Sequence, residues 1–260
     1  MPVSPEARSL AVFCDFENVA LGVREAKYAQ FDMDKVLERL LLKGSIVVKK
    51  AYCDWERYKE FKPAMHAASF EMIEIPHLRQ SGKNSADIRM VVDALDLCYT
   101  KEHVDTFVIV SGDSDFSPLV SKLRENAKTV IGVGVKNSSS DLLINNCDEF
   151  IYYDDLVRQD EQKRRAAKKR REASPAGEDK KQEAYDVVLE TLNALIAERG
   201  AEEKIWGSMV KQALKRRKPG FNESYYGFRA FSDLLEEMQQ KALIKLDPDE
   251  KSGGYLIRPA

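Results

Sequence analysis

Three short apolar runs constrain the fold of this chain more than any other feature. They are Leu10–Cys14, Thr106–Ser111 and Thr129–Val135, rich in β-branched or aromatic residues and without regular polar alternation. Strands buried on both faces of a parallel sheet have this composition. The sequence therefore predicts a parallel sheet that is covered on both sides. Further strand candidates are Ile46–Tyr52, Glu71–Ile75 and Phe150–Tyr153.

Segments with helical spacing separate these strand candidates. One begins at the N-cap candidate Asp32 and ends at Gly44. Another, Trp55–Phe70, contains Pro63 and is expected to be kinked or split. Strands that alternate with helices predict right-handed crossovers and an α/β fold of three layers. The remaining helix candidates are Ser85–Tyr99, with Ile88, Val91, Val92 and Leu95 on one face, and a segment around Phe116–Asn126.

A charged segment separates this region from the rest of the chain. Residues 158–181 are almost entirely charged or small, and Pro175 and Gly177 interrupt them. We predict a first domain at 8–157, a linker at 158–181 and a small second domain at 182–260. The basic side chains at 163–171 could bind phosphates or could simply be solvated.

The last segment has the outline of a winged helix. Helices are predicted at Ala184–Glu198, Ile205–Arg216 and from Asn222 to Met238. Strands are predicted at Ala242–Leu246 and Tyr255–Ile257. Three helices followed by a hairpin favour this small fold.

Acidic residues follow two of the buried strands. Asp15 directly follows the first, and Asp113 and Asp115 follow the strand that ends near Ser111. Functional groups gather outside the carboxyl ends of parallel strands. Asp87, at the start of a predicted helix, can join them, and Asn18 lies one turn after Asp15. Clustered carboxylates repel one another and are tolerated when a divalent cation neutralises them.

Structural explanations exist for two of these residues. Asp115 could cap the helix that follows it, and Asp87 could be a carboxylate in the first turn of its own helix. For Asp15 and Asp113 this explanation is weaker, because a charge at the end of a buried strand needs a partner and no nearby basic residue in the sequence offers one.

The donor types indicate the metal. An all-oxygen ligand set favours Mg²⁺ or Mn²⁺, and the three histidines show no metal-ligand spacing. No GxxxxGK[ST] loop occurs, and no GxGxxG follows the first strand, which argues against nucleoside triphosphate and dinucleotide binding. The net charge of −2 means that any surface for nucleic acid must be local.

Three blocks of sequence resemble the NYN domain, which belongs to the PIN-like nuclease superfamily. They are DFEN at 15–18, KNSADIRMVVDAL at 83–95 and SGDSDFSPLV at 111–120, with a closing segment near 137–153. The resemblance implies a PIN-like three-layer α/β/α sandwich with an RNase site that depends on Mg²⁺ or Mn²⁺. It also implies that Asp15, Asp87, Asp113 and Asp115 are metal-binding acids and that Asn18 accompanies them.

The C-terminal segment resembles the OST-HTH (LOTUS) domain through residues 205–238 and the closing hairpin. That resemblance implies a winged-helix module that binds RNA or a protein partner. Basic residues hold phosphates and aromatic rings stack on unpaired bases, although the basic run could also be the solvated end of a helix. The predicted RNA-binding side chains are Lys211, Lys215, Arg216, Arg217, Lys218, Tyr225 and Arg229.

These observations favour a metal-dependent ribonuclease that holds structured or single-stranded RNA. A non-catalytic RNA-binding regulator and a nuclease for single-stranded DNA are the alternatives. The four cysteines are scattered and fit reduced core thiols, no signal peptide is evident, and no apolar stretch approaches the length of a membrane span. We therefore expect a cytoplasmic protein without membrane contact, and the sequence does not indicate its oligomeric state.

Overall fold

The computed structural model describes residues 8–28, 30–75, 85–171, 179–200, 202–249 and 254–260, with the backbone alone at 163–171 and 179. The chain divides into two compact units between residues 167 and 168. The domain boundaries inferred from the sequence stay predictions.

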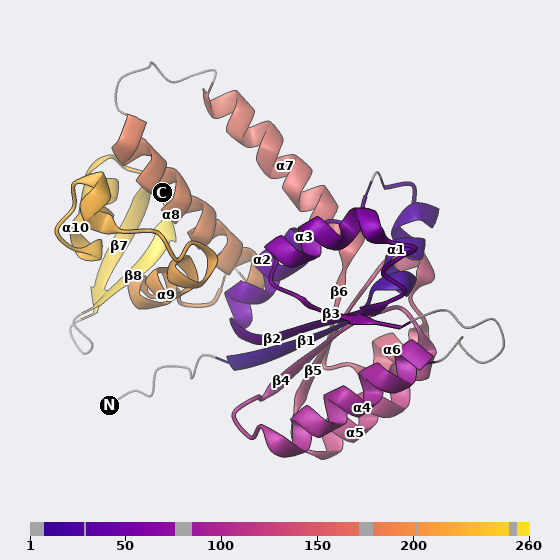
Figure 1. The fold of residues 1–260 in the computed structure, drawn as a ribbon. Coiled ribbons are helices and arrows are strands. Elements are labelled where there is room, and N and C mark those ends of the chain that lie inside the picture. The colour runs from indigo at the N-terminus through magenta and orange to yellow at the C-terminus, as the bar shows by residue number, and fades with distance from the viewer. Residues whose placement is uncertain (1–7, 29, 76–84, 172–178, 201, 250–253) are drawn as a thin grey trace. The chain divides into compact units, whose positions relative to one another are not determined.

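The N-terminal unit is built on a six-stranded parallel sheet with the strand order β3-β2-β1-β4-β5-β6. The central pair, β1 and β4, joins segments far apart in the chain, as Figure 1 shows. The strands are β1 (Arg8–Asp15), β2 (Gly44–Cys53), β3 (Glu71–Glu74), β4 (Thr106–Val110), β5 (Thr129–Gly134) and β6 (Glu149–Tyr152). The α-helices are α1 (Phe16–Glu25), α2 (Met33–Lys43), α3 (Lys62–Ala67), α4 (Ser85–Thr100), α5 (Ser117–Glu125), α6 (Asp141–Asn146) and α7 (Tyr153–Arg171). Short 3-10 helices are η1 (Lys59–Phe61), η2 (Ser114–Phe116) and η3 (Lys136–Ser138).

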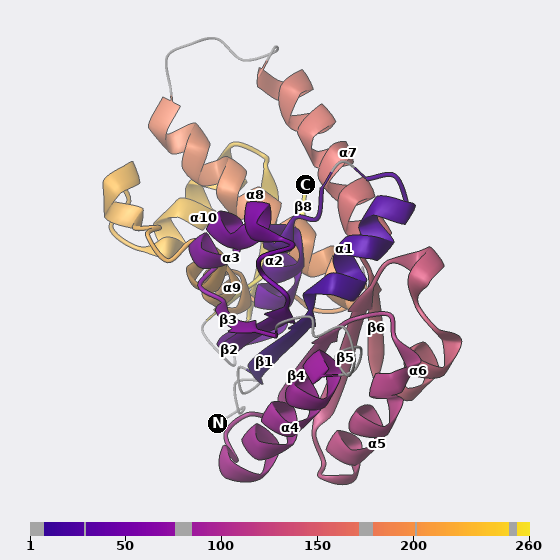
Figure 2. The same cartoon turned by 45° about the vertical axis from the view of Figure 1, so that its right-hand side comes forward.

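Helices cover both faces of this sheet, which confirms the three-layer α/β sandwich (Figure 2). Side chains of a strand alternate between faces, and β1 shows this directly. Leu10, Val12 and Cys14 pack with α1, α2, α3 and α7, whereas Ala11 and Phe13 pack with α4, α5 and α6. All five side chains are fully buried, as expected for a strand with no polar alternation.

The structure confirms the predicted ends of one helix and shows that another helix was predicted too long. Asp32 caps α2 by accepting a hydrogen bond from the backbone of Asp34 (3.1 Å), and Gly44 follows the last residue of that helix, as predicted. The predicted helix at Trp55–Phe70 is wrong in extent, because only η1 and α3 form there. Pro63 lies in the first turn of α3, where its missing N–H costs nothing.

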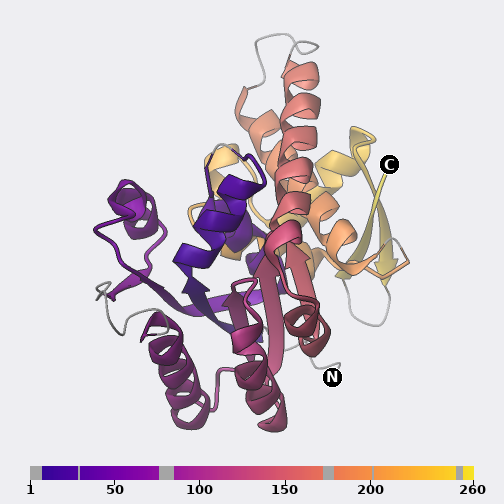
Figure 3. The same cartoon turned by 90° about the vertical axis from the view of Figure 1, so that its right-hand side faces the viewer.

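The apolar face predicted for α4 is only partly buried, with Val91 and Leu95 packed against the core. Met90, Ala94 and Cys98 face the core, whereas Ile88 and Val92 are 62% and 55% exposed. The helix carries apolar residues on two faces, and spacing alone does not distinguish which of them meets the sheet. Figure 3 shows α4 beside α5 on one side of the sheet.

The C-terminal unit consists of helices followed by an antiparallel hairpin. An isolated antiparallel bridge between Trp206 and Leu256 adds to the hairpin, in agreement with a winged-helix outline. The predicted third helix begins later than expected. Asn222 caps only a short 3-10 helix. That helix ends at Gly227, whose φ is 87°, and the next helix starts at Phe231. The elements are α8 (Asp179–Arg199), α9 (Gly207–Arg217), η4 (Glu223–Tyr226), α10 (Phe231–Gln240), β7 (Ile244–Asp249) and β8 (Gly254–Pro259).

Across the described residues, no helix combines the length and the apolar character that crossing a membrane requires.

Candidate active site

The site lies where the two central strands end. β1 and β4 are parallel neighbours, and the pairing of Cys14 with Val110 aligns their carboxyl ends. Asp15 is the last residue of β1, and Ser111-Gly112-Asp113 follows β4 directly. The structure therefore brings together the two strand-end acids that the sequence singles out.

Asp15 is held in place by neutral groups. It is 7% exposed and also caps α1, where its Oδ1 accepts a hydrogen bond from the backbone N–H of Asn18 (3.4 Å). Its Oδ2 accepts a hydrogen bond from the hydroxyl of Ser111 (3.0 Å). Among the described residues, these partners are an amide and a hydroxyl and not a cation, so the fold itself does not neutralise this buried carboxylate.

Ser111 connects the two strand ends. Its side chain is fully buried, its Oγ donates to Asp15, and the same oxygen accepts from the backbone N–H of Asp113 (3.2 Å). Asp113 in turn accepts a hydrogen bond from the backbone N–H of Asp115 (2.9 Å). These bonds fix the positions of three aspartates relative to one another.

Asn18 braces the same loop from the other side. Its Oδ1 accepts a hydrogen bond from the backbone N–H of Gly112 (2.9 Å). The amide oxygen is therefore engaged with the protein, and the Nδ2 group is the part of Asn18 that can donate to a phosphate oxygen.

The carboxylates perturb one another electrostatically. Burial, followed by the negative charge of Asp87 and a smaller effect of Asp113, raises the pKa of Asp15 to about 7. Burial, followed by the charges of Asp113, Asp115 and Glu17, raises the pKa of Asp87 to about 6. Like charges that are gathered in a partly desolvated site shift pKa values in this direction. The four predicted aspartates therefore form one electrostatic group.

Glu17 is a fifth acid of this group that the sequence analysis did not select. Its Oε1 binds the guanidinium of Arg57 (Nη1–Oε1, 3.2 Å), which is half-exposed. The signal for Glu17 was its position in the DFEN block, two residues after Asp15.

The structural alternative for Asp115 is not supported. The residue before α5 is Phe116, which makes no side-chain cap, and Asp113 rather than Asp115 caps η2. Asp87 does lie in the first turn of α4, so a favourable interaction with the helix dipole accompanies its place in the acidic group.

The donor chemistry of the acidic group fits a hard divalent cation. Its side chains offer carboxylate oxygens, and a bound Mg²⁺ or Mn²⁺ would relieve the repulsion that raises the pKa of Asp15 and Asp87. Within the part of the chain that the structure describes, no three Asp, Glu, His or Cys side chains are already arranged as a ligand set. Mg²⁺ usually keeps several waters and takes few carboxylates, so such a cage is not required.

The basic residues predicted to bind RNA occupy different environments in the C-terminal unit. Lys215, Lys218 and Arg229 are exposed. Arg217 instead turns inward: its side chain is 4% exposed and its Nη2 lies 2.8 Å from Glu190 Oε1. The structure therefore argues against the predicted RNA contact of Arg217.

The other predicted positions lie around η4 and α9. Lys211 forms an ion pair with Glu223 (3.2 Å), and Arg216 is half-buried, with burial and the nearby Arg199 lowering its pKa. Tyr225 is 61% exposed, and the ammonium of Lys180 lies 4.9 Å from the centre of its ring. An exposed ring beside a cation is suited to stacking on an unpaired base.

Replacement of Ser111 by alanine is expected to lower the activity of the acidic group by about 10–100-fold. The change removes the hydroxyl that orients Asp15 and supports Asp113. The measurement is the rate of RNA cleavage as a function of Mg²⁺ or Mn²⁺ concentration, and we expect a higher metal requirement.

Ser117→Ala is the matched control, because Ser117 is also buried but its hydroxyl has no hydrogen-bond partner in the described part of the chain. Equal rates for Ser111→Ala and wild type would show that the hydroxyl does not position the acids.

Comparisons with known proteins follow the same division of the chain. A family model described as the NYN domain matches residues 9–154, and one described as the OST-HTH/LOTUS domain matches residues 185–251. An uncharacterized protein of Methanocaldococcus jannaschii is 30% identical over 125 residues, which are 48% of this chain and 49% of that protein. The chain thus spans about half the length of the curated relative it matches. A crystal structure of a protein of unknown function from Vibrio parahaemolyticus is similar with a TM-score of 0.52 at 28% identity, covering 59% of this chain and 97% of that one.

Proposed function

The chain belongs to the NYN domain family, and from that premise we propose that it is a metal-dependent ribonuclease that hydrolyses RNA phosphodiester bonds. The observation that carries the proposal is the buried Asp15, whose pKa is raised by its own burial and by neighbouring acids at the ends of β1 and β4. Perturbed carboxylates of this kind mark functional sites.

The residues of the acidic group have distinct roles in this proposal. Asp15, Asp87, Asp113 and Asp115 would hold Mg²⁺ or Mn²⁺ through their oxygens. A bound divalent cation supplies a hydroxide-like nucleophile from water and stabilises the leaving oxygen of a phosphodiester. Ser111 holds Asp15 and Asp113 in position relative to each other through its hydroxyl group. Asn18, whose Oδ1 is bound to Gly112, donates from Nδ2 to a phosphate oxygen of the substrate.

The C-terminal unit would hold the RNA. Its match to the OST-HTH/LOTUS domain supports RNA binding. The exposed cations Lys215, Lys218 and Arg229 can bind phosphates, and Tyr225 can stack on a base. The alternative is that the same surface binds a protein partner.

We place this activity in the cytoplasm. Cys14, Cys53 and Cys98 are buried free thiols, and Cys147 is a half-buried free thiol, as expected in a reducing compartment. Separation of cells into soluble and organelle fractions, followed by detection of the full chain, tests this placement.

Removal of the metal is expected to abolish cleavage. A labelled structured RNA and a matched single-stranded DNA are incubated with the full chain in Mg²⁺, in Mn²⁺ and in EDTA. Cleavage of the RNA should occur with the metals, should stop in EDTA and should return when the metal is restored. The Asp113→Asn variant should remain inactive in every condition.

Two results would redirect the proposal. RNA binding without cleavage by the folded wild type would favour a non-catalytic regulator. Preferential cleavage of the DNA would favour a nuclease for single-stranded DNA, because a carboxylate–metal site does not by itself select the sugar.

Replacement of Tyr225 by alanine is expected to weaken RNA binding by about 1–3 kcal/mol, the usual contribution of one stacked base. The measurement is a fluorescence-anisotropy titration with a single-stranded RNA in EDTA, so that cleavage does not interfere. Tyr255→Ala is the matched control in the same unit, because the hydroxyl of Tyr255 binds Glu236 on α10. Equal losses for both variants would argue against stacking at Tyr225.

A further inference from the structure

The outward face of α4 is apolar and lies outside the acidic site. Ile88, Val92 and Tyr99 are 62%, 55% and 61% exposed, whereas the opposite side of the same helix contributes Met90 and Cys98 to the core. A shallow depression of about 510 Å³ runs along this face. Its lining residues are Ser85, Ile88, Arg89, Val92, Asp93 and Asp96.

The spacing of these side chains is that of a helix–helix seam. Ile88, Val92, Leu95 and Tyr99 follow one another in steps of four, three and four residues. Alternating steps of this kind are the a and d positions at which two helices interlock. Leu95 is half-buried and also touches the core cluster beneath α4. The face is therefore shaped to receive another helix.

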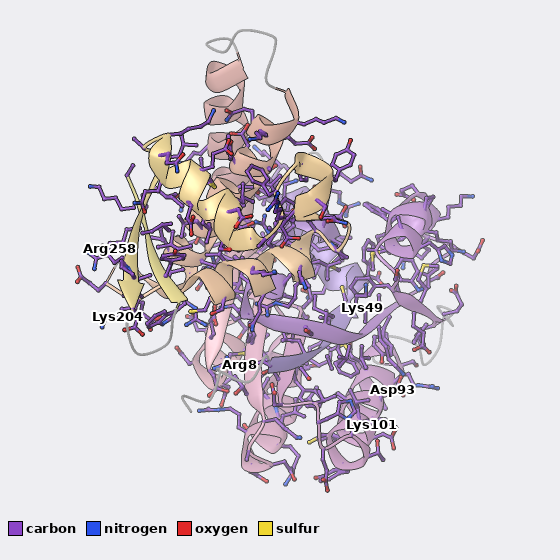
Figure 4. The ribbon with its side chains drawn as sticks, turned by 90° about the vertical axis from the view of Figure 1, so that its left-hand side faces the viewer. Arg8, Lys49, Asp93, Lys101, Lys204 and Arg258 are labelled. Carbon is purple, nitrogen blue, oxygen red and sulfur yellow. The ribbon has the colours of Figure 1, made fainter. Side chains whose placement is uncertain are left out.

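The charges beside the seam are arranged for self-recognition. In this register Arg89 and Asp96 occupy equivalent flanking positions, one heptad apart and of opposite sign. Arg89 binds Asp93 through Nε (3.0 Å to Oδ1). Asp93, labelled on α4 in Figure 4, is also fixed by the hydroxyl of Tyr52 (2.9 Å). The Asp96 carboxylate takes part in no ion pair among the described residues.

We propose that this face, the α4 seam, binds a second copy of this chain, with the two α4 helices antiparallel about a two-fold axis. Such an arrangement would place Ile88 of one copy against Tyr99 of the other and Val92 against Leu95. It would also set Arg89 of each copy against Asp96 of the other, which gives two equivalent ion pairs. A two-fold interface must be self-complementary, and this seam meets that condition in shape and in charge.

RNA is a poor occupant of the same face. The α4 seam carries apolar side chains, and Asp93 and Asp96 outnumber Arg89. Phosphates are bound by clusters of Lys and Arg, so this surface would repel them.

The test is the mass of the full chain by sedimentation velocity over a wide range of concentration. The wild type is expected to shift from one chain to two as the concentration rises. Val92→Asp places a charge in the centre of the seam and should remain a single chain throughout. Leu142→Asp is the matched control, because Leu142 is 57% exposed and lies on α6 and not on α4. The mass of this variant should follow that of the wild type.

A charge swap keeps the proposal testable even if Val92→Asp fails to fold. Asp96→Arg sets two arginines against each other and should weaken self-association by about tenfold or more. Addition of Arg89→Asp to the same chain should restore it, because the two charges then attract again. A wild type that stays a single chain at every concentration would overturn the proposal. So would self-association that Val92→Asp leaves unchanged, or a swap that restores nothing. The readout is mass, so these results do not depend on the nuclease proposal.

Discussion

Asp15→Asn is expected to lower RNA cleavage by at least about 100-fold while making the metal-free protein more stable at alkaline pH. The first effect follows from the loss of a charged oxygen ligand at the end of β1. The second follows from burial, because asparagine retains an oxygen that can cap α1 and carries no charge into the site. This one substitution therefore separates the contribution of Asp15 to the cleavage rate from its effect on the free energy of unfolding.

The direction of the stability effect follows from the pKa of Asp15. Folding raises that pKa from 3.8 to about 7, so the folded state favours the protonated carboxyl. This contribution is fully present below the unfolded pKa near 4 and is lost as the pH rises through about 7. At pH 8 the metal-free protein therefore folds against a buried charge, and the asparagine variant should gain roughly 2–4 kcal/mol in the free energy of unfolding.

Urea unfolding in EDTA at pH 5 and pH 8 measures this difference, with the larger gain expected at pH 8. Added Mg²⁺ should stabilise the wild type and not the variant. Glu125→Gln is the control, because Glu125 is an exposed carboxylate at the end of α5, before β5 begins. A variant less stable than the wild type at pH 8 would contradict the assignment of Asp15 as an unneutralised buried acid.

Gly112→Ala is expected to damage the fold and the site together. A Cβ at Gly112 would lie 2.3 Å from the backbone oxygen of Ser138 and 2.9 Å from the Cα of Ser139, and neither atom belongs to a flexible side chain. The loop after β4 would have to move, which breaks the hydrogen bond from Gly112 to Asn18. We expect a loss of about 1–3 kcal/mol in the free energy of unfolding, together with a large loss of cleavage.

Gly220→Ala provides the matched control, because a Cβ at Gly220 meets nothing within 4 Å. Thermal unfolding and cleavage rates of the two alanine variants are compared with the wild type. Gly112→Ala with wild-type stability and rate would show that the loop after β4 tolerates displacement and that its close packing is not needed to hold Asp113.

The fold could be predicted where one physical pattern dominates. The runs Leu10–Cys14 and Thr106–Ser111 contain only buried side chains, which is typical of strands that are covered on both faces of a parallel sheet. The buried face of α4 could not be predicted, because Ile88 and Val92 are as apolar as the residues that meet the core. The extent of α3 could not be predicted either, because Pro63 starts a helix as readily as it breaks one.

Some residues of the site could be predicted from the sequence and others could not. A charge directly after a buried strand is conspicuous, so Asp15 and Asp113 stand out in the sequence. The bridging hydroxyl of Ser111 and the inward turn of Arg217 depend on contacts between distant segments, and spacing along the chain does not contain them. Glu17 falls between these cases. Its place in the DFEN block can be read from the sequence, but its effect on the pKa of Asp87 depends on how the chain folds.

The hydrogen bond between Ser111 and Asp15 joins residues 96 positions apart, and this has a consequence for synthesis of the protein. A nascent chain that has emerged from the ribosome only through α4 contains Asp15 and Asp87 but lacks β4 and the acids that follow it. Long-range pairings of this kind form late, because closing the intervening loop costs entropy before any contact repays it. The growing chain therefore has no assembled site until β4 has been synthesised, and β4 must pair with β1 before the acids can act together.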